Sequence, residues 1–113
     1  MKAYAVAVIK ETRFGDEVKE YLRRIDSTLE PYEGKYLIHG GSYDVLEGGW
    51  DADVVLLEFP SMDQARAWYE SPAYRAIRSL RIRNTEGPVI LVQGVRDGHR
   101  GSDLLGQDVS QPL

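Results

Sequence analysis

The fold follows from the middle of the chain, where Gly40-Gly41-Ser42-Tyr43-Asp44-Val45-Leu46-Glu47-Gly48-Gly49-Trp50 runs toward Val54-Val55-Leu56-Leu57-Glu58-Phe59. The glycines of the first segment let the backbone bend, and this mixture is typical of a bent or bulged strand that ends in a hairpin. The second segment alternates its side chains across a strand and puts one carboxylate, Glu58, on an otherwise apolar face. The stretch therefore predicts two strands of a small sheet with an ionisable residue in it.

The segment before this stretch predicts a strand, a helix and a second strand. Residues 3–9 are small and β-branched, as in a strand buried on both faces. Asp16 is a reasonable N-cap, and apolar residues then recur at helical spacing until Pro31 interrupts the pattern near Glu30. A strand is expected from Lys35 to Gly40.

The segment after it predicts two short helices that meet at a corner. Ser61 begins a capping box, so the first helix starts at Met62. Ser71-Pro72 has the form of a second cap with proline at the first helical position. In the helix that follows, Tyr74 and Arg81 share one face.

The order of elements defines the fold class. A last strand from Val89 to Val95 completes β-α-β-β-α-β, so residues 1–95 are expected to form an α+β, ferredoxin-like domain with a four-stranded antiparallel sheet and helices on one face. The other face would expose an apolar patch too large for a monomer, so we expect a homodimer through the sheet face, that is, a dimeric α/β barrel. Residues 96–113 read as a polar C-terminal tail that is mobile or draped on a partner.

Composition excludes several classes of function. The chain has 113 residues, a net charge of −4 and no cysteine. The absence of a basic block argues against nucleic acid and anionic membranes as partners. The absence of cysteine excludes disulfides, thiolate catalysis and cysteine metal sites. No apolar stretch approaches the roughly 20 residues of a membrane span and no secretory signal is present, so we expect a cytoplasmic protein.

Five segments are similar to those of a known family: Gly34-Lys35-Tyr36-Leu37-Ile38-His39-Gly40-Gly41, Val45-Leu46-Glu47-Gly48, Leu57-Glu58-Phe59-Pro60-Ser61, Ala67-Trp68-Tyr69-Glu70-Ser71-Pro72-Ala73-Tyr74 and Leu91-Val92-Gln93-Gly94-Val95. On these residues the chain resembles the domain of unknown function 1330 family, within the dimeric α/β-barrel superfamily, over roughly residues 2–95. The resemblance implies the fold and a dimer. The superfamily includes cofactor-free monooxygenases, isomerases, dehydratases, haem-degrading proteins and ligand-sensing modules, so shape alone does not choose a reaction. Two features depart from the family: the turn at residues 48–53 is acidic, and the tail is long.

Two ionisable strand residues are candidates for catalysis. By simple alternation His39 shares its face with Lys35 and Leu37, and it is either a base that contacts a ligand or a structural residue of the dimer interface. Glu58, among apolar neighbours, is either a pocket acid or base with a raised pKa or the partner of a neighbouring strand cation or of an arginine. One histidine and one carboxylate are too few for a metal site, so no metal is expected.

Three helical residues are candidates for binding. Arg81 has the planar guanidinium that suits a ligand carboxylate, although a structural salt bridge fits equally well. Trp68 and Tyr74 lie at helical spacing typical of a core, and we expect Trp68 as a wall and Tyr74 as a polar contact of a pocket.

These residues lead to two hypotheses. The first is a cofactor-free enzyme of the oxygenase or isomerase type that acts on a small aromatic or carboxylate metabolite, in a pocket between sheet and helices lined by His39, Glu58, Trp68, Tyr74 and Arg81. No Gly-rich phosphate loop or nucleophile elbow is present, so nucleotide binding and triad hydrolysis are poorly supported. The second is a non-catalytic dimeric ligand-binding or interaction module. A ligand site requires a cavity of roughly 300 Å³ or more, whereas a filled interior would favour the interaction module.

Overall fold

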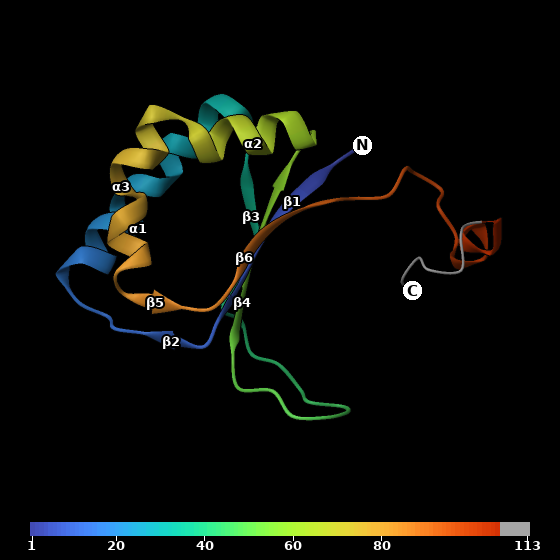
Figure 1. The fold of residues 1–113 in the computed structure, drawn as a ribbon, viewed down its shortest axis with the longest axis horizontal. Coiled ribbons are helices and arrows are strands. Elements are labelled where there is room, and N and C mark those ends of the chain that lie inside the picture. The colour runs from blue at the N-terminus through green and yellow to red at the C-terminus, as the bar shows by residue number, and fades with distance from the viewer. Residues whose placement is uncertain (107–113) are drawn as a thin grey trace.

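A four-stranded antiparallel sheet forms the centre of the molecule, as a computed structural model describes it for residues 1–106 (Figure 1). Its strands are β3 (Lys35–His39), β4 (Asp53–Phe59), β1 (Ala3–Ile9) and β6 (Val89–Gln93), in this order across the sheet. β1 pairs with both β4 and β6 and is therefore a central strand; Ala3, Ala5 and Ile9 on its inner face are buried, whereas Tyr4, Val6 and Val8 on its outer face are only half-buried, so the expected burial on both faces is wrong. The expected α+β, ferredoxin-like arrangement is confirmed.

The three α-helices of the described residues lie on one face of this sheet (Figure 1). They are α1 (Asp16–Leu29), α2 (Met62–Glu70) and α3 (Pro72–Ile82), and a 3₁₀ turn at Glu30–Tyr32 contains Pro31. Ser61 and Ser71 accept the expected N-cap hydrogen bonds from the backbone N–H groups of Gln64 and Tyr74. The expected cap at Asp16 is wrong, because α1 has Gly15 as its N-cap and Asp16 already belongs to the first turn.

A second, two-stranded ribbon was not predicted. β2 (Glu11–Thr12) pairs with β5 (Thr85–Glu86), and strands of two residues are too short to leave a periodic pattern. Gly87 joins the ribbon to β6 with a φ of 137°, and a Cβ there would lie 1.8 Å from the Val8 carbonyl oxygen. Only glycine fits this close approach.

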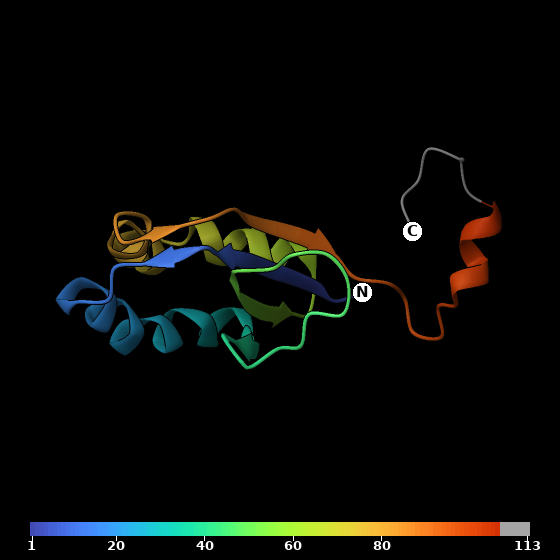
Figure 2. The same ribbon diagram turned by 90° about the horizontal axis from the view of Figure 1, so that it is seen from below.

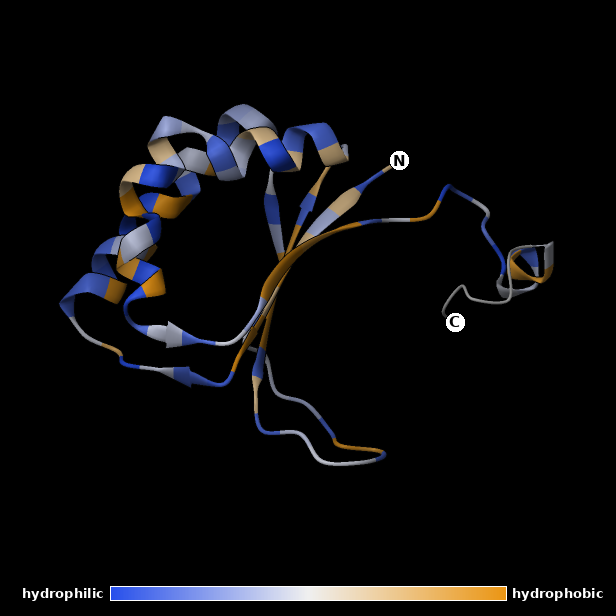
Figure 3. Ribbon diagram, in the orientation of Figure 1, coloured by the Kyte–Doolittle hydropathy of each residue, from blue (hydrophilic) through white to orange (hydrophobic). Residues whose placement is uncertain are grey.

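The core lies between the helices and the inner face of the sheet. Phe59, Ala65 and Ile77 are fully buried, and Tyr74 is 2% exposed. Apolar residues run along the central strands and along the inward sides of the helices (Figure 3). This single core fixes the helices over the sheet and leaves its other face uncovered.

Two segments project from this body. Residues 40–52 form a loop without strand pairing, so the expected bent strand is wrong there. The loop joins β3 to its antiparallel neighbour β4, and the bulge lies earlier, inside β3. After β6, the chain leads away from the sheet to a 3₁₀ helix at Gly101–Gly106 (Figure 2). The radius of gyration is 16.0 Å, compared with about 13 Å for a compact chain of this length. The remainder of the expected tail, residues 107–113, lies outside the described residues.

None of the described helices is both long and apolar enough to span a membrane.

Candidate functional site

A cavity of about 340 Å³ lies between the helices and the inner face of the sheet. Its walls are mostly aliphatic and aromatic, and its polar lining residues include Tyr21, Tyr36, His39, Asp53, Tyr74 and Arg81. Binding sites for small molecules typically measure about 300–1,000 Å³ and combine an apolar wall with a few polar groups. The interior therefore has room for a ligand, which favours a ligand site over a filled interaction module.

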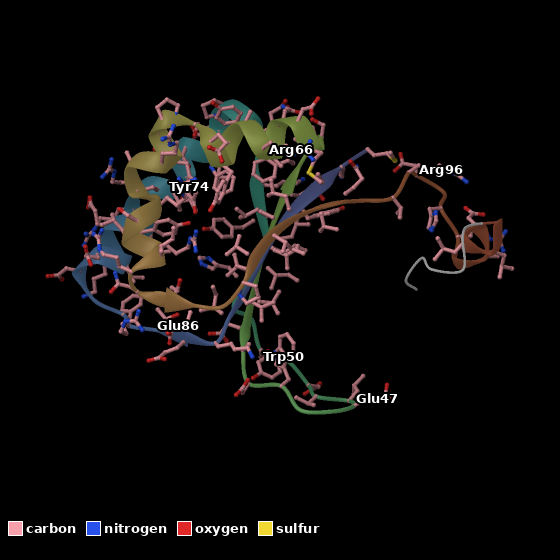
Figure 4. The ribbon with its side chains drawn as sticks, viewed as in Figure 1. Glu47, Trp50, Arg66, Tyr74, Glu86 and Arg96 are labelled. Atoms are coloured by element: carbon pink, nitrogen blue, oxygen red, sulfur yellow. The ribbon has the colours of Figure 1, made fainter. Side chains whose placement is uncertain are left out.

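A chain of hydrogen bonds crosses the helical wall of the cavity. The Arg81 Nε–H donates to the Tyr74 hydroxyl oxygen at 3.2 Å, and the hydroxyl oxygens of Tyr74 and Tyr21 lie 2.8 Å apart. Tyr74 and Arg81 are seven residues apart on α3, which is close to two helical turns and puts both on one side. Tyr21 reaches them from α1, so the packing of α1 against α3 assembles the chain (Figure 4 shows Tyr74 between the helices and the sheet).

Counting the hydroxyl protons of this chain shows what it offers a ligand. Tyr21 and Tyr74 each have one O–H group, and the bond between them uses one of these two protons. Arg81 donates to Tyr74 and therefore uses none. Whichever tyrosine donates, the pair keeps one further O–H donor beside the guanidinium.

The site keeps a positive charge next to neutral phenols. Burial raises the pKa of Tyr21, and the adjacent Tyr74 raises it further. Burial also raises the pKa of Tyr36. Burial opposes the charge on Arg81, but the phenol oxygens of Tyr74 and Tyr21 outweigh it and raise the pKa of Arg81 above its ordinary value. Tyr21, Tyr36 and Arg81 therefore keep their protons at neutral pH and can donate hydrogen bonds.

Arg81 lacks a carboxylate partner within residues 1–106. Arg83, two residues on, pairs with Glu17, whereas no ion pair to Arg81 forms. No fully buried side-chain nitrogen or oxygen in the described part lacks a hydrogen bond, so the remaining N–H groups of Arg81 face accessible space. A half-buried cation is usually neutralised. A ligand anion in the cavity would supply the missing charge.

The structure corrects the predicted orientation of His39. A β-bulge in β3 between Tyr36 and Ile38 shifts the register by one residue, so Tyr36 pairs with Leu57 and His39 with Val55. His39 therefore shares the inner face with Tyr36, not the outer face with Lys35. Its ring stacks on Tyr36 with a centroid separation of 4.4 Å, and it lines the open rim of the cavity.

The structure also removes Glu58 from the cavity. Glu58 pairs across β1 with Tyr4, on the sheet face opposite the helices. Its carboxylate lies 3.2 Å from Lys2 Nζ and 3.4 Å from Lys35 Nζ. Partial burial alone would raise the pKa of Glu58, but the two lysines outweigh it and hold the pKa below its ordinary value. Glu58 is thus paired with neighbouring strand cations, one of the two alternatives that the sequence left open, and the other alternative, a pocket acid or base with a raised pKa, is wrong.

Trp68 forms part of the cavity wall. Its indole Nε1–H donates to the Thr28 hydroxyl at 3.0 Å, and its ring centroid lies 4.1 Å from that of Tyr74. With its only polar atom satisfied, Trp68 presents apolar surface to the cavity. The structure thus brings His39, Trp68, Tyr74 and Arg81 to one cavity, and their contact with a ligand stays a prediction.

Sequence reasoning missed Tyr21 and Tyr36. Tyr21 belongs to the apolar face of α1, where it reads as an ordinary core residue. The hydroxyl group of Tyr21 was the available signal. A buried phenol needs a hydrogen-bond partner, and a tyrosine on another helix could provide one. Tyr36 was hidden by the bulge that turns it and His39 to the same face.

The donors needed for a metal site are not gathered in the described part of the chain. Among residues 1–106 no three histidine or carboxylate side chains lie close enough together to hold a metal ion. Arg81 and the tyrosine hydroxyl groups of the cavity are instead hydrogen-bond donors, which suit an oxygen anion.

Comparison with protein families and solved structures identifies the fold. The family model described as domain of unknown function (DUF1330) matches residues 2–95. No curated protein matches the sequence.

Three solved structures illustrate the similarity of fold. A protein of unknown function from Rhodopseudomonas palustris has a TM-score of 0.60 and 18% identity, with 84% of this chain and 83% of that chain covered. A dimeric ferredoxin-like protein of unknown function from Jannaschia sp. CCS1 has a TM-score of 0.62 and 12% identity, with 83% and 100% covered. A dimeric ferredoxin-like protein of unknown function from Thermobifida fusca YX has a TM-score of 0.52 and 14% identity, with 80% and 89% covered.

Proposed function

Because the chain belongs to the family described as domain of unknown function 1330 and has a cavity with an unpaired arginine, we propose that it is a homodimeric enzyme for a small aromatic carboxylate or keto acid. The observation that supports this most directly is the unpaired guanidinium of Arg81 beside the two phenols. The aromatic and aliphatic wall would hold an aromatic ring, and Arg81 would hold the oxygen anion.

The arrangement suits an isomerase-type proton transfer. His39 would take a proton from the carbon next to a carbonyl group, and the electron pair of that C–H bond would move onto the carbonyl oxygen. Arg81 and the remaining phenolic O–H would stabilise the enolate that forms. His39 would then return the proton, either to the same carbon or to the other end of the enolate. Atoms and charge balance without a co-reactant.

The uncovered sheet face supports the homodimer. Ile90 is 54% exposed and Val92 is 41% exposed on the face that no helix covers. A contiguous apolar face of this kind is normally covered by another protein surface. The Jannaschia and Thermobifida proteins, similar in fold, are described as dimeric.

A thermal-shift experiment tests the binding site. The probes are benzoate, phenylacetate and phenylpyruvate, measured with the wild type, Arg81→Ala and Arg75→Ala. Arg75 lies on the same helix, is exposed, and forms no side-chain hydrogen bond or ion pair among the described residues, so Arg75→Ala removes the same charge as Arg81→Ala. A ligand at 100 times its Kd stabilises the folded state by about 2.7 kcal/mol. We expect a probe to raise Tm in the wild type and in Arg75→Ala and to lose this effect in Arg81→Ala.

Two results would overturn the assignment. Equal shifts in all three proteins would mean that Arg81 does not hold the anion. No shift with any aromatic carboxylate, together with a correctly folded wild type, would contradict the proposed ligand class.

Deuterium exchange separates catalysis from binding. The enzyme is mixed with phenylpyruvate in D₂O, and loss of the benzylic proton is followed by NMR. We expect His39→Gln to keep the thermal shift and to slow exchange by about 10²-fold or more, as for loss of a general base. Binding of phenylpyruvate without faster exchange in the wild type would favour the non-catalytic ligand-binding module.

A further inference from the structure

The loop at residues 40–52 exposes large apolar side chains. Leu46 is 90% exposed, and Tyr43, Val45 and Trp50 are each more than 40% exposed. Figure 4 shows Glu47 at the far tip of this loop, away from the helices and the sheet. Four large apolar groups on one projecting loop indicate a surface that another protein covers.

The same loop is acidic. Asp44, Glu47 and Asp51 lie within it, and residues 40–52 contain no lysine, arginine or histidine. None of the three carboxylates forms an ion pair with residues 1–106. A partner for the loop would therefore combine apolar surface with positive charge.

The uncovered sheet face has this combination. Its strands expose Ile38, Ile90 and Val92. At one end of the face, Lys2 and Lys35 share the single carboxylate of Glu58, which leaves one net positive charge. We name Lys2, Lys35 and Glu58 the lysine cluster.

The loop does not reach the lysine cluster of its own chain. Lys35 begins β3, whereas the loop follows His39 at the other end of that strand and precedes Asp53 at the start of β4, with Glu58 near the end of β4. The loop and the lysine cluster therefore lie at opposite ends of β4, a strand that rises roughly 3.3 Å per residue. In a two-fold dimer whose sheets face each other with reversed strand directions, the loop of one copy lies at the lysine cluster of the other.

We propose that residues 40–52 of one copy dock on the uncovered sheet face of a second copy, with their carboxylates at the partner's lysine cluster. This inference rests on the homodimer proposed above. It assigns a function to the exposed apolar groups of the loop and to the surplus charge of the lysine cluster together. By symmetry each copy contributes one loop and one lysine cluster.

Docking of the loop would also complete each cavity. His39 and Gly40 at one end of the loop and Asp53 at the other end line the cavity. A loop held by the partner would fix these rim residues, including the proposed base. Ligand affinity should therefore fall when loop docking is lost, even in a dimer.

Charge reversal on each side tests the inference. The loop variant combines Asp44→Lys, Glu47→Lys and Asp51→Lys. The cluster variant combines Lys2→Glu, Lys35→Glu and Glu58→Lys, which keeps ion pairs within the cluster while reversing its net charge. A third protein has both sets. The matched control combines Asp26→Lys, Glu30→Lys and Glu70→Lys, exposed positions on the helical side that change the net charge as much as the loop variant does.

The readout is the Kd of the dimer from sedimentation velocity at low ionic strength, with circular dichroism to verify folding. We expect the loop variant and the cluster variant each to weaken the dimer about tenfold or more, because close charge pairs across an interface are typically worth that much. The protein with both sets should return to within about threefold of the wild type, and the control should stay near the wild type.

The outcomes separate this inference from the homodimer itself. A monomeric wild type would overturn the homodimer before any variant is made. A dimeric wild type whose Kd is unchanged in the loop variant, or not restored in the combined protein, would overturn loop docking and leave the homodimer standing. If the cluster variant fails to fold, Lys35→Gln alone, read against the loop variant, gives the same decision: additive losses of affinity contradict a direct contact.

Discussion

The two faces of the sheet differ more than their sequences suggest. On the inner face, Ala5, Leu57 and Phe59 are buried beneath the helices. On the outer face, Tyr4, Val6 and Leu56 occupy the alternating positions of the same strands, and no helix covers them. Both faces are apolar, but one has a covering layer within the chain and the other does not.

This difference separates the charges as well. On the inner side of the sheet, Arg81 lines the cavity and forms no ion pair with residues 1–106. The outer face has a carboxylate with two cations, at Glu58. The inner face is therefore equipped for a small anion, and the outer face for a protein surface with negative charge.

The largest expected effect comes from emptying the inner face. Phe59 is fully buried, and Phe59→Ala should lower the free energy of unfolding by about 3–5 kcal/mol through lost burial and a residual cavity. Denaturation by urea measures this loss. The control is Leu46→Ala on the exposed loop, measured at a concentration where the wild type is monomeric; it should change the free energy of unfolding by less than about 0.5 kcal/mol. Equal losses in the two variants would contradict the assigned core.

The next largest effect comes from charging the outer face. Ile90 is 54% exposed, so Ile90→Lys should leave the isolated fold intact. In a dimer that covers this face, the same lysine would be buried without a partner and should weaken association about 100-fold or more. Sedimentation velocity over a dilution series measures the Kd. Arg75→Ala, a change of one charge on α3, should leave the Kd unchanged, and a dimer that tolerates Ile90→Lys would not use this face.

The fold could be predicted from the sequence because its signals are local. The caps at Ser61 and Ser71 fix where two helices begin, and alternation in β4 fixes which of its residues share a face. These patterns determine the order of elements and hence the ferredoxin-like sheet. They do not depend on contacts between distant residues.

The site could be predicted only in part because it depends on register and on long-range contacts. A bulge of one residue in β3 reverses the orientation of His39, and nothing in the alternation of that short strand reveals it. Glu58 was expected in the pocket because strand alternation cannot tell which apolar face the helices cover. Tyr21 meets Tyr74 over 53 residues of sequence, so only the packing of α1 on α3 brings them together.

A smaller effect is expected at the inner face, from loss of one hydroxyl group in the cavity. Tyr21→Phe removes one hydroxyl from the pair and leaves the ring in place, so it should cost about 1 kcal/mol of stability. Tyr21 and Tyr74 together have two O–H donors, one for the bond between them and one for a ligand. Tyr21→Phe leaves only one donor for both purposes. We expect the thermal shift produced by an aromatic carboxylate to decrease but not to vanish, since Arg81 remains. Tyr69→Phe is the control, because Tyr69 belongs to the same aromatic cluster but its hydroxyl forms no hydrogen bond among the described residues.

The smallest effect is expected at the outer face, where the contribution of Glu58 to stability depends on pH. Lys2 and Lys35 hold the pKa of Glu58 below its ordinary value of 4.5, against the effect of burial. A carboxylate whose pKa is lower in the folded state contributes stability above its unfolded pKa and loses it as the pH falls through the folded pKa. The wild type should therefore be slightly more stable than Glu58→Gln at pH 7, and this difference should close below about pH 4.5. Urea denaturation of both proteins from pH 7 to pH 3 measures the difference, with Asp63→Asn on the helical side as the control. A difference that widens on acidification would mean that the two lysines do not stabilise the ionised carboxylate, and the contrast in charge between the two faces would be lost.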